Sequence, residues 1–477
     1  MHLAVLTEQQ VERLHEASLH MLNTVGVHVP HPDVRERLRD AGASLHEEQA
    51  RVTIPQEVVE QGLERAGKSF TIYGRDRSKP AVFGEGQRNY NSVAGEALWI
   101  DDDTGKRRYA SLADVAAAAR LGDALPDLTI VGAMSDPHEL SPEYGGVAVA
   151  AELVRNTTKP VGLWFHNRQA ARFIVELLVA VAGSEEEAAQ YPLTYPFLEP
   201  ISPLRFPYHG LDVLYETARL NLPVPIGPMA QTGISAPGTL AGTLAQENAE
   251  ILAGICMVQL IGPGTPVCYG GIPHAFDMRT TQMIFAGPEQ ALMAIAMTQM
   301  GKHYGLPVYI NVGLTDSKTV DAQAGLEAGI TLTCGALAGA DIFGHLGICG
   351  VDQASSLDML VMQHEIIGYV ERFIRGIRFQ EDCLGLEVIE SVGPGGTFID
   401  QEHTALNFRK ELWFPRLLDR QFYDAWLKDG SRPMADRCRE EKKRLLAEHE
   451  REPLPDDVDR EIERVLEAAR RHLPEDD

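Results

Sequence analysis

Between residues 89 and 375, short apolar or β-branched runs alternate with longer helical runs, and this alternation constrains the fold more than any other feature. It predicts parallel strands joined by helical crossovers. Strands are expected at residues 89–94, 128–134, 160–165, 193–198, 224–229, 266–270, 307–312 and 340–345. Helices are expected at residues 112–124, 144–155, 169–182, 210–220, 238–261, 288–304, 321–338 and 355–375. Eight such pairs are the count of an α/β (β/α)8 TIM barrel.

A doubly wound sheet is the rival architecture, and it would carry a glycine fingerprint in its first βα turn. The first turn here, residues 94–103, contains a single glycine and resembles a small hairpin insertion. The glycine-rich stretches 262–264 and 393–396 do not match GxGxxG. These patterns favour the barrel and give nucleotide binding little support.

Two regions flank the expected barrel domain, which covers residues 86–378. Residues 1–85 predict a small α/β cap that begins with an amphipathic helix from Glu8 to Thr24, reciprocally capped by Thr7 and Gln10. Residues 379–477 predict a helical extension with an aromatic-rich part and a strongly charged end. We expect this extension to pack on the barrel with a solvated terminal helix, and an oligomer or partner contact is the alternative.

Charge and cysteine content exclude several functional classes. The formal net charge of −25 disfavours nucleic-acid and anionic membrane partners. The six cysteines form no CxxC pair and have no accompanying histidine cluster, which argues against structural zinc and a disulfide framework. No secretory signal core and no apolar stretch of about 20 residues is present, so we expect a soluble protein of the reducing cytoplasm.

The C-terminal ends of barrel strands carry the chemistry of this fold. In this sequence they are rich in aromatic and amide side chains, poor in acid/base pairs, and without histidine or carboxylate spacing for a metal ion. His15 and His20 lie about 140° apart around a helix and cannot share one metal ion. Aromatic faces attract a weakly hydrated quaternary ammonium, although aromatics that merely plug the barrel are the alternative.

Glu199 is a stronger candidate, because a carboxylate that follows an apolar strand is costly to bury without a partner. A salt bridge to Arg205 is its structural alternative. His274 and His345 each follow a strand among glycines, where a purely structural histidine is the alternative. Asp316 begins a stretch that ends in Lys318 and that also suits an ordinary helix N-cap.

Several separate stretches, in the right order over nearly the whole chain, resemble the trimethylamine methyltransferase superfamily. They are Thr315-Asp-Ser-Lys-Thr-Val-Asp-Ala-Gln-Ala-Gly-Leu-Glu327, Val361-x-x-x-Glu365-Ile-Ile, Val392-Gly-Pro-Gly-Gly-Thr-Phe398, Glu402-His-Thr404 and the N-terminal Leu-Thr-Glu-Gln-Gln-x-Glu-x-Leu-His-Glu-Ala run. The resemblance implies a TIM barrel that moves a methyl group from a methylated amine to cobalt in a corrinoid. That corrinoid is carried by a separate small protein.

The chain shows no pyrrolysine, which the trimethylamine enzymes of the family carry, so it resembles the branch that demethylates glycine betaine and related betaines. A quaternary ammonium leaves as a neutral amine and needs no general acid. We therefore assign no catalytic residue, and the protein's task is positioning. No Asp-x-His-x-x-Gly cobalamin pattern occurs, so the corrinoid is expected on a cognate partner docked over the barrel mouth.

The hypothesis divides the site residues by role. The aromatic faces for the trimethylammonium group are Phe165, Phe197, Tyr269 and Phe276, the counter-charge is Glu199, and the polar end is fixed by Asn91, Gln231, Asn311, His274 and His345. A betaine carboxylate would need a donor among Arg205, Arg279, Lys318, His274 and His345. We expect a homo-oligomer. The alternatives are a non-catalytic betaine-binding protein and a family enzyme that acts on another methylated amine.

Overall fold

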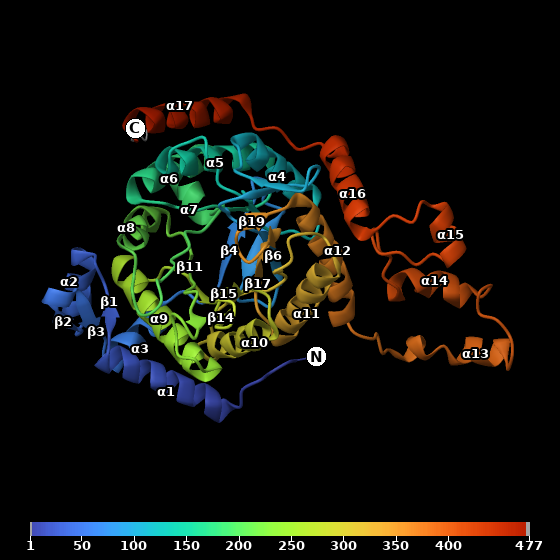
Figure 1. Ribbon diagram of the computed structural model, residues 1–477, viewed down its shortest axis with the longest axis horizontal. Coiled ribbons are helices and arrows are strands. Elements are labelled where there is room, and N and C mark those ends of the chain that lie inside the picture. Colours follow the sequence, from blue (N-terminus) through green and yellow to red (C-terminus); the bar gives the residue numbers. More distant parts are fainter. Residues whose placement is uncertain (1, 474–477) are drawn as a thin grey trace.

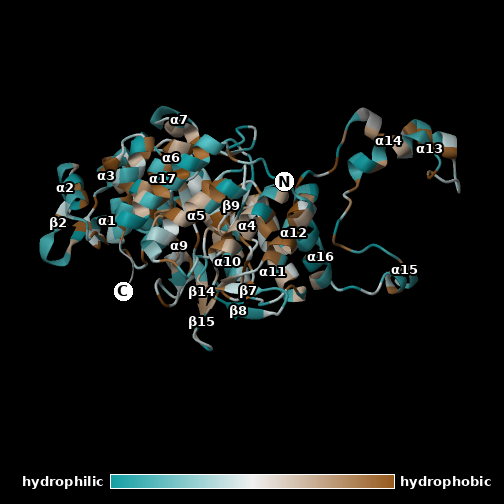
Figure 2. Ribbon diagram, turned by 90° about the horizontal axis from the view of Figure 1, so that it is seen from above, coloured by the Kyte–Doolittle hydropathy of each residue, from teal (hydrophilic) through white to brown (hydrophobic). Residues whose placement is uncertain are grey.

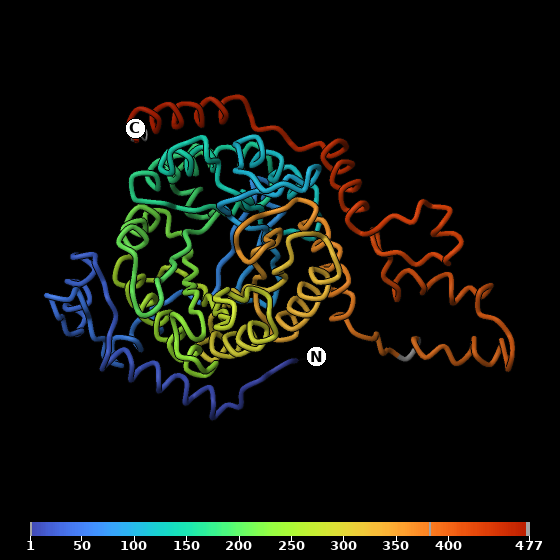
Figure 3. The backbone as a smooth tube through the Cα atoms, in the orientation of Figure 1, coloured from blue at the N-terminus to red at the C-terminus, as the bar shows by residue number. Residues whose placement is uncertain are grey.

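A computed structural model describes residues 2–473, except for the side chains at positions 381 and 382. Its centre is a closed ring of parallel strands surrounded by helices (Figure 1, Figure 3). The strands are β6 (Asn89–Ser92), β9 (Val131–Gly132), β10 (Val161–Gly162), β11 (Val224–Ile226), β13 (Val267–Gly271), β16 (Val308–Asn311) and β17 (Ile342–Leu346). Five of them pair in the order β11-β13-β16-β17-β6, and β9 pairs with β10. The TIM barrel predicted from the alternation is confirmed.

The fourth barrel position is extended backbone at residues 193–198 without a regular ladder. The Val161 N–H donates to the Leu193 carbonyl at 2.9 Å, and Leu198 bridges to Ile226 in parallel. Pro196 lies inside this segment, and proline has no N–H to donate to a ladder. A parallel bridge between Asn91 and Ile130 closes the ring between β6 and β9.

The outer helices agree with the predicted ones to within two residues at each start. They are α4 (Leu112–Ala124), α5 (Pro142–Asn156), α6 (Arg168–Ala182), α8 (Tyr208–Thr217), α9 (Leu240–Ile261), α10 (Pro288–His303), α11 (Ala322–Ala338) and α12 (Leu357–Ile374). Side-chain N-caps fix several starts, among them Ser111, Asn167, Thr239, Asp321 and Ser356. Such caps are local features, which explains the agreement.

The barrel has two separate apolar layers, one inside the ring and one between the ring and its helices. The inner cluster contains Ile130, Tyr195, Cys268, Tyr309 and Ile342. It also contains Ile72, Ala81 and Phe83 from a hairpin of β4 (Phe70–Tyr73) and β5 (Pro80–Phe83). This hairpin precedes β6 in the chain and closes the N-terminal end of the barrel, so the site lies at the other end.

The N-terminal region, described from residue 2 on, contains three α-helices and a small sheet beside the barrel. Helices α1 (Glu8–Thr24) and α3 (Gln56–Arg65) pack on α9, beside α2 (Pro32–Asp40) and a sheet of β1 (Val27–His28), β3 (Arg51–Thr53) and β2 (Ser44–His46). The predicted capping pair is present, since Thr7 Oγ1 accepts from the Gln10 N–H at 3.3 Å and Gln10 Oε1 accepts from the Thr7 N–H at 2.8 Å.

Residues 62–69 spell GxxxxGKS, the letters of a phosphate-binding loop, so the glycine patterns alone do not exclude one. A phosphate loop requires a strand before it and a helix after it. Here the order is reversed, because Gly62 lies in α3 and β4 follows Ser69. The Lys68 ammonium donates to the Tyr304 carbonyl at 3.3 Å. The stretch is therefore a helix-to-strand connection.

The C-terminal extension divides into a packed part and a part that stands apart. Helices α16 (Met434–Glu448) and α17 (Asp456–His472) pack on the barrel helices, and α17 buries Ile462, Leu466 and Ala469. Residues 377–430, here called the arm, contain α13 (Leu386–Val392), α14 (Glu402–Glu411) and α15 (Tyr423–Lys428) and project away from the barrel (Figure 1, Figure 2). The expected packing of the extension on the barrel is therefore found for α16 and α17 and not for the arm, and the terminal helix α17 is solvated on one face only. Along residues 2–473, every helix is too short or too polar to cross a membrane.

Candidate active site

A cavity of about 540 Å³ opens at the C-terminal ends of the third, fourth and fifth barrel strands. Its lining comes from the ends of these strands and from the loops that follow them. The lining residues are Trp164, Phe197, Glu199, Pro200, Ile201, Ser202, Pro207, Gly210, Met229, Gln231, Ile234 and Ser235. Three residues of the sequence hypothesis, Phe197, Glu199 and Gln231, therefore share one cavity.

Aromatic rings form one wall of the cavity and continue into the barrel. Trp164 meets Phe197 edge to face with ring centroids 6.1 Å apart, and its Nε1–H donates to the Gly95 carbonyl at 3.1 Å. Phe197 in turn meets Tyr309, a member of the inner cluster, at 5.2 Å and 70°. These rings present quadrupoles that attract a bulky cation.

Four carboxylates gather at the mouth, and all of them have raised pKa values. Burial and the nearby Asp352 charge raise the pKa of Glu199 to about 7, although its side chain stays open to the cavity. Burial raises the pKa of Asp352 to about 6 and that of Asp136 above its ordinary value. Burial also raises the pKa of Glu96, with further contributions from the charges of Asp352, Asp136 and Glu199. No lysine or arginine occurs among the described residues that line the cavity.

Asp352 reaches the mouth through a strained loop. Val351 and Asp352 have positive φ values of 63° and 56°, which cost a β-branched residue such as valine about 1–3 kcal/mol. The loop lies between β18 (Ile348–Cys349) and β19 (Ala354–Ser355), which join β7 (Trp99–Asp101) and β8 (Lys106–Arg108) in one small sheet. The predicted hairpin insertion near residue 100 is thus part of the structure that holds this carboxylate.

Amide and imidazole groups form a polar layer next to the inner aromatic rings. Asn91 Nδ2 donates to the Tyr309 hydroxyl at 3.4 Å, and Asn311 Nδ2 lies 3.4 Å from Nε2 of His274. His345 lies beside Tyr309 with ring centroids 5.6 Å apart. The Oδ1 atoms of Asn91 and Asn311 are buried without a hydrogen-bond partner. Buried acceptors of this kind are uncommon and call for an explanation.

Both histidines of this layer are neutral near pH 7. Burial and the charge of His345 lower the pKa of His274 to about 3. Burial lowers the pKa of His345 to about 4. Neither ring therefore supplies a permanent positive charge, and each offers a neutral donor or acceptor instead.

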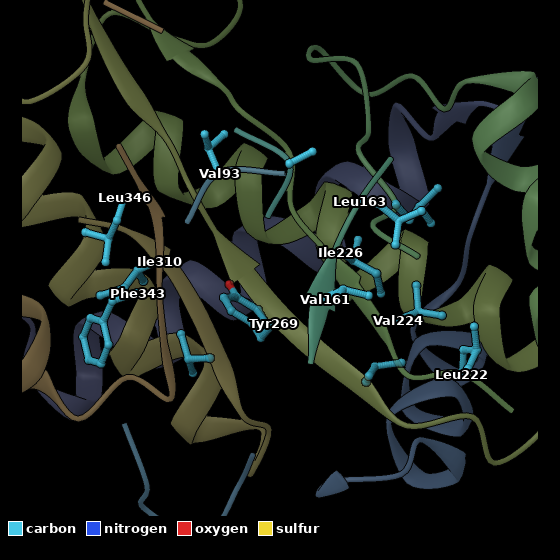
Figure 4. Packing of buried hydrophobic residues seen from close by; sticks show 14 of the residues in the cluster. Val93, Val161, Leu163, Leu222, Val224, Ile226, Tyr269, Ile310, Phe343 and Leu346 are labelled. Carbon is cyan, nitrogen blue, oxygen red and sulfur yellow. The ribbon is translucent and has the colours of Figure 1, made fainter. Parts of the chain in front are cut away.

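Three predicted aromatic faces do not line the cavity. The Tyr269 hydroxyl donates to Asn248 Oδ1 on α9 at 2.7 Å, and Tyr269 belongs to the packed layer between strands and helices (Figure 4). Phe165 packs against the same outer layer. Phe276 lies on β14 (His274–Asp277), which pairs with β15 (Gln282–Ile284) outside the cavity lining. Successive strand residues face opposite sides, so Trp164, the neighbour of Phe165, faces the cavity instead.

The arginines and the lysine considered for a substrate carboxylate are not among the described lining residues of the cavity, although Arg205 lies next to the lining residue Ile201. Arg279 forms a bidentate ion pair with Asp277 beyond the β14 strand, with both bonds at 3.0 Å. The Lys318 ammonium donates to the Asp316 carbonyl at 2.8 Å. Arg205 pairs through its backbone with Ile201, and among the described residues it forms no ion pair with Glu199. The proposed Glu199–Arg205 salt bridge is therefore absent from the described part of the chain.

The stretches that carry the family resemblance brace loops and the tail. Asp316 Oδ1 accepts from the Phe285 N–H at 3.0 Å, so the proposed helix N-cap is instead Asp321, which accepts from the Ala324 N–H at 2.9 Å. Glu365 Oε1 accepts from three consecutive backbone N–H groups at residues 416–418, at 2.9, 2.9 and 3.2 Å. These contacts hold the root of the arm against α12.

Sequence reasoning missed four groups of the mouth: Trp164, Glu96, Asp136 and Asp352. Strand alternation was the available signal for Trp164. Asp136 stands at the end of the second strand, and a carboxylate at this position was the available signal for a site residue. Glu96 and Asp352 lie on loops whose path no local pattern reveals. Within residues 2–473, no group of three or more histidine, cysteine, aspartate or glutamate side chains could hold a metal ion.

Comparison with known proteins gives consistent results. The family model "Trimethylamine methyltransferase (MTTB)" matches residues 1–474. A glycine betaine methyltransferase of Desulfitobacterium hafniense is 32% identical over 466 residues, covering 97% of this chain and 96% of that protein. A trimethylamine methyltransferase of Methanosarcina thermophila is 29% identical over 480 residues, covering 96% and 95%.

A solved structure shares the fold. The monomethylamine methyltransferase of Methanosarcina barkeri superposes with a TM-score of 0.50 at 11% identity, covering 91% of this chain and 92% of that one. At this identity the likeness bears on the fold alone. The family model spans the whole barrel, the cap and the extension, and so the chain belongs to the trimethylamine methyltransferase family of enzymes.

Proposed function

We propose that this methyltransferase moves a methyl group from a small quaternary amine to Co(I) of a corrinoid carried by a separate protein. Family membership supports methyl transfer from a methylated amine, and the glycine betaine relative makes betaines the first substrates to test. One observation carries the quaternary amine: the cavity combines the rings of Trp164 and Phe197 with one carboxyl group, that of Glu199, and no lysine or arginine is among its described lining residues. Such a lining attracts a cation that offers no hydrogen bond.

The proposed reaction requires no general acid or base from the protein. The C–N bond breaks with its electron pair remaining on nitrogen, so the amine leaves neutral and needs no proton. The methyl group joins Co(I), which supplies the electron pair of the new bond. The chain must bind the ammonium, exclude water and aim one methyl group out of the mouth. The carboxyl groups of the mouth form no acid/base relay in this scheme, and Glu199 and Asp352, whose pKa values are raised to about 7 and about 6, supply counter-charge when they are ionised.

We assign the sequence candidates to two levels of the site. Phe197, together with Trp164, faces the ammonium group, and Glu199 supplies charge beside it. Gln231 reaches the same cavity from the fifth strand. The polar end of the substrate is fixed deeper, by Asn91, His274, Asn311 and His345. Phe165, Tyr269 and Phe276 are left out, because they lie outside the lining.

The corrinoid belongs to the partner as methyl acceptor. The cavity of about 540 Å³ suits a small amine, whereas a corrin macrocycle is larger and has to approach from outside. Exposed apolar side chains stand at the rim, namely Ile201, Ile234 and Met278. A Cβ atom added at Gly233, the neighbour of Ile234, would lie 3.8 Å from the Met278 sulfur. We place the cognate corrinoid protein on this rim, in the cytoplasm.

The arm is where we place a second copy of the chain. Phe422 and Ile377 are 92% and 88% exposed, and α11 and α12 expose Leu326 and Tyr369 on the barrel. A second apolar hollow of about 540 Å³, partly lined by Tyr369, lies at the root of the arm. One chain thus carries two uncovered apolar surfaces, so a two-fold dimer in which each arm covers the partner's α11–α12 face would bury both.

The direct test measures methylation of free cob(I)alamin by a panel of betaines with the wild type, Glu199→Gln and His345→Ala. We expect methyl transfer by the wild type and a raised KM in both variants. Wild-type rates in both variants would remove these two residues from the site. Tight betaine binding without methyl transfer would instead favour a non-catalytic binding protein, and transfer from a different amine would identify a family enzyme of other specificity.

A further inference from the structure

Helix α9 carries three buried polar side chains that hold loops of the barrel mouth. Glu250 shares a face of the helix with Gln246 and Glu247, because they precede it by four and three residues. Glu247 accepts from the Ala230 N–H at 3.0 Å and from the Ile272 N–H at 3.1 Å, which ties the ends of the fifth and sixth strands together. None of the three is among the described lining residues of the cavity, and the methyl-transfer scheme gives them no role.

Glu250 bonds directly to a residue that does line the cavity. Ser202 Oγ donates to Glu250 Oε2 at 2.6 Å, the distance of a hydroxyl that donates to an ionised carboxylate. Glu250 Oε1 accepts from the Leu204 N–H at 2.7 Å and from Gln246 Nε2 at 3.0 Å. Three donors therefore converge on the two carboxylate oxygens, which suits an acceptor-only group.

The charge of Glu250 has no cation beside it in the described part of the chain. Burial raises the pKa of Glu250 above its ordinary value, and the hydrogen bonds from Leu204, Ser202 and Gln246 act in the opposite direction. A cation held in the adjoining cavity would favour the ionised form as well. A cationic substrate would thus supply the positive charge that the protein itself does not.

The loop that carries Ser202 is held firmly enough to fix the direction of the hydroxyl. Ile201 and Arg205 exchange two backbone hydrogen bonds at 2.8 and 3.2 Å, and the Leu204 carbonyl accepts from the His28 N–H at 2.8 Å. Leu204 has a φ of 54°, a left-handed conformation that is costly for leucine and persists where several contacts enforce it. The bond from the Leu204 N–H to Glu250 is one of these contacts.

Ser202 consequently offers the cavity an acceptor and not a donor. A serine hydroxyl has one hydrogen and two lone pairs, and here the hydrogen points to Glu250. The lone pairs form no hydrogen bond with the described residues, so they are free for a ligand in the cavity that Ser202 lines. The positive charge of a quaternary ammonium is shared by its methyl groups, which approach an acceptor through weak C–H···O contacts.

We propose that Ser202 Oγ contacts the ammonium group of the substrate, and that Glu250 is the positioning residue that keeps the serine hydrogen turned away from it. The inference rests on the proposed function and adds Ser202 and Glu250 to its site. Neither residue exchanges a proton with the substrate, so the bonds made and broken stay the same. The pair recognises positive charge before the methyl group moves, so its loss should raise KM more than it lowers kcat.

Glu250→Gln is the sharpest variant, because the new amide can keep the bond to the Leu204 N–H through its oxygen and donate to Ser202 through its NH₂. The serine hydrogen would then turn toward the cavity and oppose a cation. Glycine betaine and 3,3-dimethylbutanoate supply a matched pair of ligands, since they have one shape and differ in a cationic nitrogen against a neutral carbon. Tetramethylammonium presents the head group alone.

Calorimetry with the full chain at pH 8 would measure the binding of all three ligands. We expect the wild type to prefer betaine to its carbon isostere, and Glu250→Gln to reduce this preference and the affinity for tetramethylammonium about tenfold, which corresponds to ~1.4 kcal/mol. Ser202→Ala should weaken both as well, and Glu250→Gln should add little to it. In methyl transfer to free cob(I)alamin, both variants should raise KM with kcat near the wild-type value.

Glu247→Gln is the matched control, because it removes the same charge from the same buried helix and contacts no hydroxyl of the cavity. Its effect should be equal with and without Ser202→Ala, whereas that of Glu250→Gln should not. Thermal denaturation would check that each variant folds. If Glu250→Gln does not fold, Ser202→Ala, which deletes a single hydroxyl, still decides.

The outcomes separate this inference from the proposed function. Unchanged binding of both ammonium ligands in Ser202→Ala would overturn the inference, and so would a wild type that neither prefers betaine to its isostere nor binds tetramethylammonium. A Glu250→Gln effect that is equally large without the Ser202 hydroxyl would overturn the role of Glu250 and show that it acts on the loop through Leu204. The expected binding changes without any methyl transfer would support the inference and contradict the proposed reaction. Methyl transfer with a KM that Ser202→Ala does not change would do the reverse.

Discussion

The barrel mouth and the arm depart from an ordinary protein surface in opposite ways. The mouth gathers carboxylates and buries two unpartnered amide oxygens, those of Asn91 and Asn311. The arm exposes large apolar side chains, with Phe422 92% and Ile377 88% accessible. Each region is incomplete by itself, because buried acceptors need donors and clustered apolar surface needs cover. The difference indicates two partners of different chemistry, a small cation in the mouth and a protein surface on the arm.

The largest effect is expected in the arm. Phe422→Asp combined with Ile377→Asp should weaken self-association about 100-fold or more, because burying each large apolar side chain contributes about 1.5–3 kcal/mol. Light scattering and sedimentation over a range of concentrations would measure it. Val25→Asp, at an exposed apolar position outside the arm, is the control. A wild type that is monomeric at every concentration would show that the exposed apolar side chains of the arm do not bind a second copy of the chain.

In the mouth, the aromatic wall should have the next largest effect. Phe197→Leu keeps apolar volume but removes the ring, so KM for a trimethylammonium substrate should rise about 30-fold, corresponding to ~2 kcal/mol for a desolvated cation–π contact. Steady-state kinetics with free cob(I)alamin would show it. Phe165→Leu is the matched control, since Phe165 packs on the helix side one residue from the lining. Equal effects of the two substitutions would contradict the assigned cavity.

A smaller effect is expected from pH: raising the pH should strengthen binding of a cationic substrate and lower the stability of the fold. The pKa of Glu199 is about 7 and that of Asp352 about 6, so both gain negative charge as pH rises from 5 to 8. KM for a cation should fall over this range by up to about tenfold, roughly one unit of log K for a modest charge interaction. The folded state holds these protons more tightly than the unfolded state, so the same rise in pH lowers stability.

Kinetics at fixed ionic strength and thermal denaturation over the same pH range test both signs. Asp352→Asn should flatten both curves. A KM that does not change between pH 5 and 8, or a melting temperature that rises steadily with pH in the wild type and not in Asp352→Asn, would show that these carboxylates do not titrate as described.

The smallest effect tests the opposite face of a barrel strand. Tyr269→Phe removes the hydroxyl that donates to Asn248 behind the strand, so stability should fall by about 1 kcal/mol. KM should stay at the wild-type value, because the ring does not reach the cavity. Denaturant unfolding and steady-state kinetics measure the two quantities. A change in KM comparable with that of Phe197→Leu would contradict the placement of Tyr269 on the helix side of its strand, away from the cavity.

The sequence predicted the scaffold better than the site, for a physical reason. Helix starts depend on contacts three residues apart, such as Thr7 with Gln10, and these were visible in the chain. The strand positions were also visible, but which residue of a strand faces inward depends on register within the closed ring. Tyr269 and Phe165 were therefore placed on the wrong face, while Phe197, Glu199 and Gln231 lie in the cavity.

The remaining site residues depend on loop paths. Glu96 and Asp352 are more than 250 positions apart and meet only because one small sheet joins β7 with β19 across the barrel mouth. Asp352 also adopts a left-handed backbone conformation that the neighbouring residues in the sequence do not predict. Likewise, aromatic residues in the tail suggested packing, and only the structure shows that the arm leaves the barrel.

By itself, the sequence determined the alternation of strands and helices, the caps and the family resemblance, because these follow from short-range periodicity and local hydrogen bonds. The tertiary structure alone decided which side chains face the cavity, that carboxylates outnumber cations there, and that the arm is uncovered. Those properties depend on the closure of the barrel, which brings strand ends and loops from distant parts of the chain to one mouth.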